Sequence, residues 1–271
     1  MGALGPLNVI FIVMLFVAFV VSICIHESAH ALAALALGDD TPRHDGRISL
    51  NPLRQMTALG TMVALILSFL STFSLYLAGA AAGLALGWGK QVRFDALKLR
   101  FGPNIGTILV ALAGPLSNLV LGIVGAFGLA AIHQPQRFFD DVLFCAHGST
   151  AQQCLDGTIP WWQFRGEQLL FAFIVVNIGL FLINLIPLYP LDGYRVLFAL
   201  LPSRQAISFR RAEPYMELIV LAILFILPML IAFTGAGELA LLSPFYWVFR
   251  GTLAIAGSII NPNYPTIFYA F

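Results

Sequence analysis

Long apolar stretches separated by short polar connections make up most of the sequence. A membrane-spanning helix needs about 20 mostly apolar residues, because all its backbone groups must be hydrogen-bonded without water. Five segments meet this requirement: residues 7–37, 58–86, 105–132, 168–186 and 217–233. A sixth, residues 239–260, contains Pro244 and Arg250 and fits a broken, tilted or interfacial helix as well as a span. The pattern predicts an all-α polytopic membrane protein with five to six transmembrane segments.

The polar connections between the apolar stretches are short. Residues 38–57 are rich in turn-forming Gly, Pro, Asp and Asn, and residues 88–104 include a run of alternating apolar and polar side chains. Short β-strands are expected in these loops, at residues 47–50 and 92–96. No polar interval approaches the roughly 50 residues of a separate soluble domain. We therefore expect one membrane-embedded domain over residues 1–271, with a core of residues 7–200 and C-terminal helices within residues 213–260.

Composition supports a membrane protein and excludes one class of partner. The chain is 59% hydrophobic and only 10% charged, against about 25% charged residues in soluble domains. With 14 Lys and Arg, 13 Asp and Glu, a net charge of +1 and no basic run, it has no surface suited to a phosphate backbone, so nucleic acid is not an expected partner. The first apolar segment is too long for the core of a signal peptide, and no Lys or Arg precedes Arg43. It is expected to stay in the mature protein.

The first apolar segment carries the motif HExxH. On a helix, the i, i+4 spacing of His26 and His30 puts both imidazoles on one face, where they can share a zinc ion. Glu27 then lies beside the metal and can take a proton from a zinc-activated water, as in metalloproteases. Three ionisable groups in an apolar helix are costly unless they face a wet, functional interior. The motif therefore indicates a catalytic zinc site within the membrane.

A catalytic zinc site needs a third protein ligand and one open position. The best candidate is Asp192, which follows Pro187 and Pro190 at the point where these prolines end the fourth apolar segment. A different lineage of membrane zinc protease would take a later Glu as the third ligand. None of the later Glu residues stands in a suitable setting on an apolar helix.

Four motifs together resemble the site-2 proteases, which are intramembrane zinc metalloproteases. They are HESAH at residues 26–30, GRISLNP at 46–52, AGPLSN at 113–118 and NLIPLYPLDGYR at 184–195. They stand in the family's order within residues 7–200. The chain resembles the compact members, since it has room for neither a PDZ domain nor a CBS pair.

The resemblance implies a role for each matching residue. His26, His30 and Asp192 would ligate one Zn²⁺ and Glu27 would be the base. Asn118 and Asn184 would hold the substrate strand or the developing oxyanion, although an Asn in a membrane helix is as often a packing hydrogen bond. The implied activity is hydrolysis of peptide bonds in or near transmembrane segments of membrane-protein substrates, with regulatory partners that the sequence does not identify. The alternative is a zinc-binding transporter or scaffold without turnover.

The zinc hypothesis constrains the topology. If four segments crossed in simple alternation, HExxH and Asp192 would lie at opposite membrane faces, so residues 58–86 are expected to be re-entrant or a helical hairpin. One face then holds Arg43, Arg47, Arg54, Lys90, Arg93, Lys98, Arg100, Arg195, Arg204, Arg210 and Arg211, against Arg137 and Arg165 on the other. By the positive-inside rule, the mouth of the active site faces the cytosol, with the cell (plasma) membrane as the expected location. Cys145 and Cys154 would lie outside, as a disulfide or as two free thiols.

Overall fold

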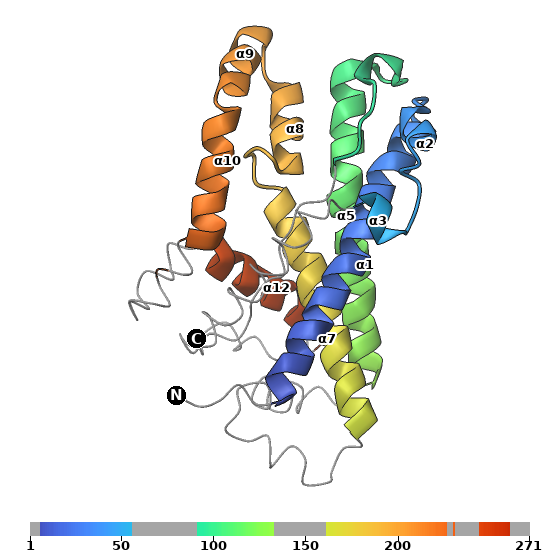
Figure 1. Cartoon of the computed structure of the whole chain (residues 1–271), viewed down its shortest axis with the longest axis vertical. Coiled ribbons are helices and arrows are strands. Elements are labelled where there is room, and N and C mark those ends of the chain that lie inside the picture. Colours follow the sequence, from blue (N-terminus) through green and yellow to red (C-terminus); the bar gives the residue numbers. More distant parts are fainter. Residues whose placement is uncertain (1–5, 56–90, 133–160, 227–229, 231–243, 261–271) are drawn as a thin grey trace.

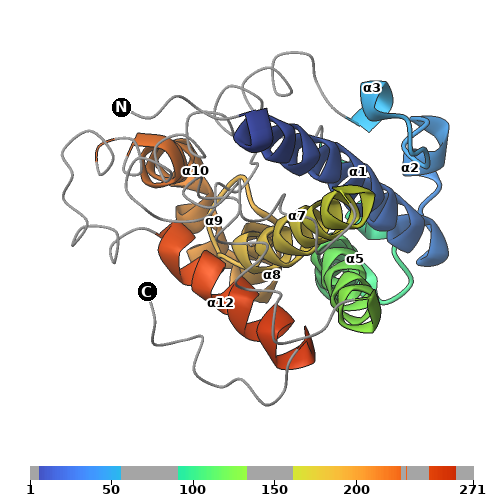
Figure 2. The same ribbon diagram turned by 90° about the horizontal axis from the view of Figure 1, so that it is seen from below.

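Three long helices form the centre of the protein. The computed structural model describes residues 6–55, 91–132, 161–226, 230 and 244–260 (Figure 1). The long helices are α1 (Pro6–Ala36), α5 (Gly102–Ile132) and α7 (Trp161–Asn184). In Figure 1, α1 and α7 run in one direction and α5 runs in the other. Seen from below, α7 is the central helix, with α1, α5 and α12 (Pro244–Ile260) around it (Figure 2).

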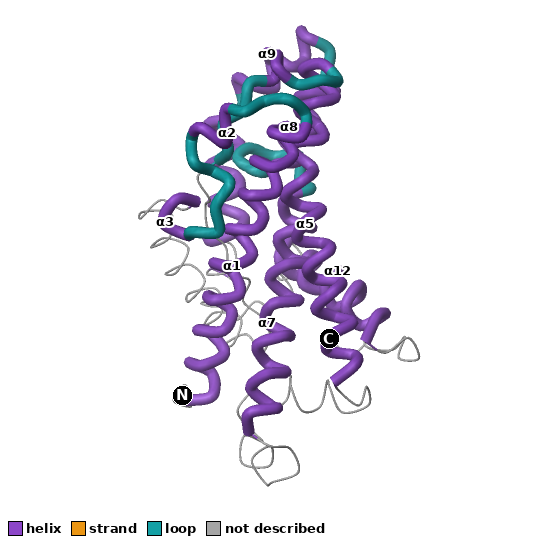
Figure 3. The backbone as a smooth tube through the Cα atoms, turned by 90° about the vertical axis from the view of Figure 1, so that its right-hand side faces the viewer, coloured by secondary structure: helices purple, strands orange, loops and turns teal. Residues whose placement is uncertain are grey.

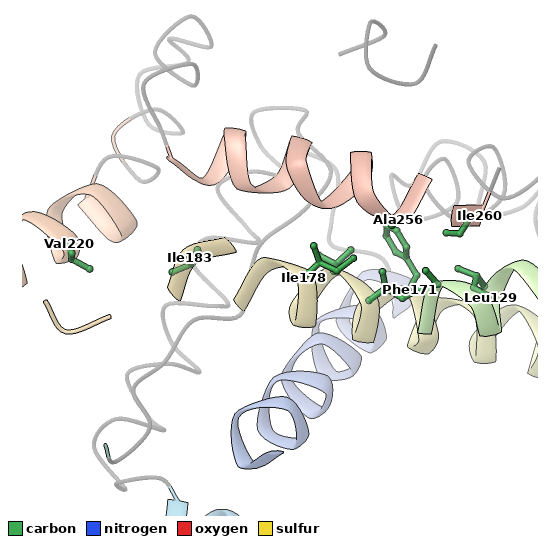
Figure 4. Close-up of a cluster of buried hydrophobic side chains, with 10 residues drawn as sticks. Leu129, Phe171, Ile178, Ile183, Val220, Ala256 and Ile260 are labelled. Atoms are coloured by element: carbon green, nitrogen blue, oxygen red, sulfur yellow. The ribbon is translucent and has the colours of Figure 1, made fainter. Parts of the chain in front are cut away.

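Small residues let these helices approach closely. On α5, a Cβ at Gly122 would lie 2.5 Å from Ile178 Cγ1, and one at Gly125 would lie 2.9 Å from Ile174 Cγ1. Glycine therefore permits the contact between α5 and α7, as is common where membrane helices pack. A buried apolar cluster joins α5 and α7 to α12. Figure 4 draws it and labels Leu129, Phe171, Ile178, Ile183, Val220, Ala256 and Ile260.

The remaining described elements are short. Two helices, α2 (Thr41–His44) and α3 (Pro52–Gln55), follow α1, and the 3₁₀ turn η1 (Ala96–Lys98) precedes α5. After α7 come α8 (Asp192–Leu200), α9 (Ser203–Arg211), α10 (Glu213–Leu221) and the π-helical turn η3 (Ala222–Ile226). The loops after α1, before α5 and after α7 gather toward one end of the molecule, which we call the loop end (Figure 3).

The chain contains membrane-spanning helices, as predicted. Three stretches of the described helices are long and apolar enough to cross a bilayer: Val13–Ala36, Gly102–Ala131 and Gly166–Asn184. The total of five to six spans stays a prediction, because residues 58–86 and the end of the fifth segment lie outside the described residues. Cys145 and Cys154 lie outside them too. The single domain with a core over residues 7–200 and C-terminal helices within 213–260 likewise stays a prediction.

The described residues on either side of the expected re-entrant segment lie at the loop end. Gln55, which precedes it, is fully buried and donates to the backbone oxygens of Arg47 and Ser49, at 2.6 and 2.7 Å. Gln91, which follows it, donates to Pro190 O at 3.0 Å. Gln55 and Gln91 thus both bond to loops at the loop end, and the course of the chain between them stays a prediction.

The prediction of short strands in the loops is wrong for the described residues. Residues 47–50 and 92–96 form no strand. The backbone carbonyls of Arg47 and Ser49 accept hydrogen bonds from the Gln55 side chain, and Asp95 N donates to the Asp39 carboxylate at 2.7 Å. Side chains therefore take the backbone hydrogen bonds that a neighbouring strand would have made.

Asp39, just after the end of α1, is hydrogen-bonded to the loop that leads into α5. Its carboxylate is fully buried and also accepts from Thr41 N at 3.1 Å and Thr41 Oγ1 at 2.6 Å. Beside it, Arg100 N donates to Leu37 O at 2.9 Å. These bonds fix the position of α5 relative to the part of α1 that carries HExxH.

Replacing Asp39 by Asn is expected to lower the free energy of unfolding by about 1–3 kcal/mol, because a buried donor loses its acceptor. Burial raises the pKa of the Asp39 carboxyl, but the Thr41 and Asp95 hydrogen bonds and the Lys98 ammonium outweigh it, so the pKa lies below its ordinary value. The stabilisation is therefore present above about pH 4 and is lost as the pH falls through the native pKa. Thermal unfolding in detergent from pH 7 to pH 3 measures this effect. The neighbouring exposed variant Asp40→Asn is the control, and an equal loss in both variants would contradict the prediction.

Candidate active site

HExxH lies on α1, in the last three turns of the helix, which ends at Ala36. The rings of His26 and His30 pack edge to face with centroids 4.6 Å apart, and both side chains are buried. The four-residue spacing brings them to one face of the helix, as the sequence predicted. His44 on α2 is exposed and pairs with the Asp40 carboxylate, whereas Cys24 on α1 packs in the apolar core.

Asp192 reaches this face from the start of α8, directly after the loop that follows α7. Gln91 holds that loop, since it donates to Pro190 O and accepts from Arg195 Nη2 at 2.9 Å. A Cβ at Gly193 would lie 2.5 Å from the carbonyl oxygens of Leu185 and Ile186. Only glycine fits so close to backbone, and this turn places Asp192 at the first residue of α8.

Three side-chain atoms converge between α1 and α8. Asp192 Oδ2 lies 3.0 Å from His26 Nε2 and 3.1 Å from His30 Nε2. The two Nε2 atoms are 3.0 Å apart. These residues form a group suited to one metal ion, and it is the only such group found among the described residues.

One face of α5 orients both imidazoles. His30 Nδ1 donates to Val110 O at 2.7 Å, and His26 Nδ1 donates to Asn118 Oδ1 at 3.2 Å. Between them lies Gly114, where a Cβ would be 2.7 Å from His26 Cε1 and would also overlap His30 Nε2. Residues 110, 114 and 118 are four apart and so share this face.

The donor set fits zinc. With each Nδ1 carrying the proton that it donates, both Nε2 atoms present lone pairs toward each other and toward the Asp192 carboxylate. Three acceptors about 3 Å apart repel one another unless a cation lies among them. Ligand atoms around one tetrahedral zinc, at about 2.0–2.1 Å from it, would be about 3.3–3.4 Å apart, close to the observed separations. Two imidazoles and one carboxylate also form a known catalytic zinc set that leaves a coordination position open.

Of the other predicted site residues, Glu27 and Asn118 lie beside His26, whereas Asn184 does not contact the proposed ligands. Glu27 is buried beside His26, and its Oε2 has no hydrogen-bond partner. Asn118 lies against His26, as described above. Asn184 is not brought into contact with the ligands, because its amide donates to Leu180 O of its own helix at 2.9 Å.

Three positions at the site were not identified from the sequence: Gln91, Gly114 and the carbonyl of Val110. The AGPLSN motif pointed to this part of α5, but not to the close contact at Gly114. A backbone acceptor such as Val110 O has no signature in a sequence. Gln91 joins a loop about 100 residues away in the chain, and no local pattern predicts such a contact.

Comparison with known proteins identifies the family. The family model described as peptidase family M50 matches residues 14–227. The chain belongs to peptidase family M50, the site-2 protease family. A curated relative is the Bacillus subtilis (strain 168) protein named "Putative zinc metalloprotease YwhC", which is 30% identical over 243 residues, or 88% of this chain and 94% of the relative. No solved structure matches the chain significantly.

Membership of family M50 settles the class of protein. The chain is a zinc metallopeptidase, and Zn²⁺ is its cofactor, as the sequence predicted. The transporter or scaffold alternative is therefore not retained. Its apolar helices make this M50 peptidase a membrane protein.

Proposed function

We propose that this M50 peptidase hydrolyses peptide bonds in or near the transmembrane segments of membrane-protein substrates. His26, His30 and Asp192 would hold one Zn²⁺ per chain, and Glu27 would be the general base. The observation that carries the proposal is the convergence of three acceptor atoms beside a buried carboxylate, with two of the three supplied by a helix apolar enough to span a bilayer. Ionisable groups at such a depth mark functional sites, because burying them without a purpose is costly.

Glu27 performs the proton transfers in this proposal. A bound zinc supplies Lewis acidity, which makes water nucleophilic near neutral pH and polarises the scissile carbonyl. The Glu27 carboxylate accepts the proton of the attacking water and then donates it to the leaving amine nitrogen. Its Oε2 is available for this, since no group in the described part of the chain binds it.

The substrate in this proposal is the transmembrane helix of a partner protein. An intact helix engages its carbonyls in i to i+4 hydrogen bonds, so the segment must unwind before it reaches Glu27. Small or helix-weakening residues near the cleavage site would favour unwinding. The lipid bilayer is the shared environment, and regulation by other membrane proteins is part of the same proposal.

We also propose that the mouth of the site faces the cytosol and that the enzyme resides in the plasma membrane. The elements between α1 and α5 at the loop end are rich in cations: Arg43 is on α2, Arg54 on α3 and Lys98 on η1, and Arg93 and Arg100 flank η1. Cytoplasmic loops are enriched in Lys and Arg, which supports this orientation. Labelling of single cysteines at the loop end in intact cells tests it, since only a permeant reagent should reach them.

Metal content of the detergent-purified protein tests the ligand set. Wild type should contain about one zinc per chain, and Asp192→Ala should lose it because two ligands do not complete a catalytic zinc site. Atomic absorption of both proteins after gel filtration measures the difference. Asp40→Ala, an exposed Asp at the loop end, is the matched control. Zinc retained by Asp192→Ala would remove Asp192 from the site.

A further inference from the structure

The Asn118 side chain occupies a position that helix packing alone does not explain. It is fully buried on α5, and its Oδ1 accepts from His26 Nδ1 at 3.2 Å. Its Nδ2 is buried without a hydrogen-bond partner. A half-satisfied amide costs stability in an apolar bundle, whereas a leucine of similar volume would not. Asn177 on α7 is also half-satisfied, through its Oδ1, but only Asn118 directs its hydrogen bond to a proposed zinc ligand.

We propose that Asn118 is a positioning residue that fixes the tautomer and ring orientation of His26 toward the metal. This inference rests on the proposed zinc ligands and adds a residue that contacts neither the metal nor the substrate in this role. A ligand that binds metal through Nε2 must carry its proton on Nδ1, and that proton needs an acceptor. Asn118 Oδ1 is that acceptor.

The chemistry of His26 also determines which way the amide points. Oxygen and nitrogen of an Asn side chain are assigned from their hydrogen-bond partners. Since His26 Nδ1 donates, the amide must turn its oxygen toward the ring and its nitrogen away. The unpartnered Nδ2 is therefore the cost of supplying this acceptor.

His30 has the corresponding support from the main chain. Its Nδ1 bonds to Val110 O at 2.7 Å, two turns before Asn118 on the same face of α5. No substitution removes a backbone carbonyl. Of these two acceptors, only Asn118 is a side chain. Mutation can therefore test only the support of His26.

Asn177 on α7 provides a matched control. It is also a fully buried Asn in a spanning helix, and its Nδ2 donates to Ser22 Oγ on α1 and to Phe173 O, each at 2.8 Å. It joins two helices but touches no proposed zinc ligand. Loss of Asn177 should therefore affect packing, and loss of Asn118 should affect the metal.

The experiment measures zinc affinity and metal-free stability separately. The proteins are full-length wild type, Asn118→Leu, Asn118→Asp and Asn177→Leu in detergent. Zinc dissociation constants come from competition with a chelator, and Co²⁺ added to the metal-free proteins reports ligand geometry through its visible absorption. We expect Asn118→Leu to weaken zinc binding by about 10- to 100-fold and to alter the Co²⁺ spectrum. Its metal-free Tm should stay near that of wild type.

The remaining two variants have opposite expected effects. Asn118→Asp keeps an acceptor and should bind zinc within a few-fold of wild type. Asn177→Leu should have a lower metal-free Tm and an unchanged zinc affinity.

Two results would overturn the inference. One is a wild-type zinc affinity and Co²⁺ spectrum in Asn118→Leu. The other is an affinity loss in Asn118→Asp equal to that in Asn118→Leu. If Asn118→Leu does not fold, the comparison of Asn118→Asp with Asn118→Ala applies the same test. Failure of wild type itself to bind zinc would instead refute the proposed ligand set.

Discussion

Glu27→Gln is expected to reduce proteolysis by about 10²- to 10⁴-fold, the usual contribution of a general base, and to leave one zinc per chain. Glutamine keeps the shape of the side chain but cannot accept a proton. Glu27 is buried and its Oε2 has no hydrogen-bond partner among the described residues, so an amide nitrogen in place of this oxygen displaces no described donor. Cleavage of a fluorescently labelled single-span polypeptide with a Gly-Pro pair in its transmembrane segment, co-reconstituted in liposomes, measures the effect.

Glu217→Gln is the matched control, since Glu217 is an exposed carboxylate on α10 and should not influence cleavage. Undiminished cleavage by Glu27→Gln would refute the role of Glu27 as base. Loss of zinc in the same variant would show that Glu27 acts on the metal site instead. The inactive protein with zinc bound would also serve to capture natural substrates.

Gly114→Ala is expected to weaken zinc binding by at least about 100-fold, the upper end of the range for residues around a metal site. The added methyl would lie 2.7 Å from His26 Cε1 and closer still to His30 Nε2, a proposed ligand atom. The neighbouring rings cannot move away without leaving Val110 O and Asn118 Oδ1. Chelator competition and the Co²⁺ spectrum measure the loss.

Gly122→Ala separates this effect from general damage to helix packing. Gly122 is on the same helix, and its added Cβ would lie 2.5 Å from Ile178 Cγ1, far from the proposed ligands. The Gly122→Ala protein should have a lower Tm than wild type and the same zinc affinity. Equal zinc affinity in Gly114→Ala and wild type would show that the site tolerates a wider separation between α1 and α5.

The sequence predicted the parts of the site whose geometry is local. The spacing of His26 and His30 determines a shared helix face, and the apolar stretch around them indicates depth in the membrane. The requirement that HExxH and Asp192 meet was the basis for predicting that residues 58–86 turn back, and the described residues on either side of that segment, Gln55 and Gln91, both bond to loops at the loop end. A geometric constraint between two motifs therefore carried information beyond either motif alone.

Other features depend on contacts that the sequence does not encode locally. The predicted strand at residues 47–50 is absent because the Gln55 amide binds the Arg47 and Ser49 carbonyls. Asn184 donates to Leu180 O of its own helix, and its role toward a substrate, implied by the resemblance, stays a prediction. At residues 47–50 a side-chain hydrogen bond to the backbone decided the structure, and alternation did not reveal it.

The distance along the chain between the proposed ligands has a consequence for biosynthesis. His26 and Asp192 are 166 residues apart, so at about 5–20 residues per second the ribosome completes the ligand set about 10–30 s after HExxH has been made. Until then, α1 holds two imidazoles without their carboxylate partner. The nascent chain is consequently an inactive peptidase while it is inserted among other unassembled membrane helices, and activity begins only when α7 and α8 have joined the bundle.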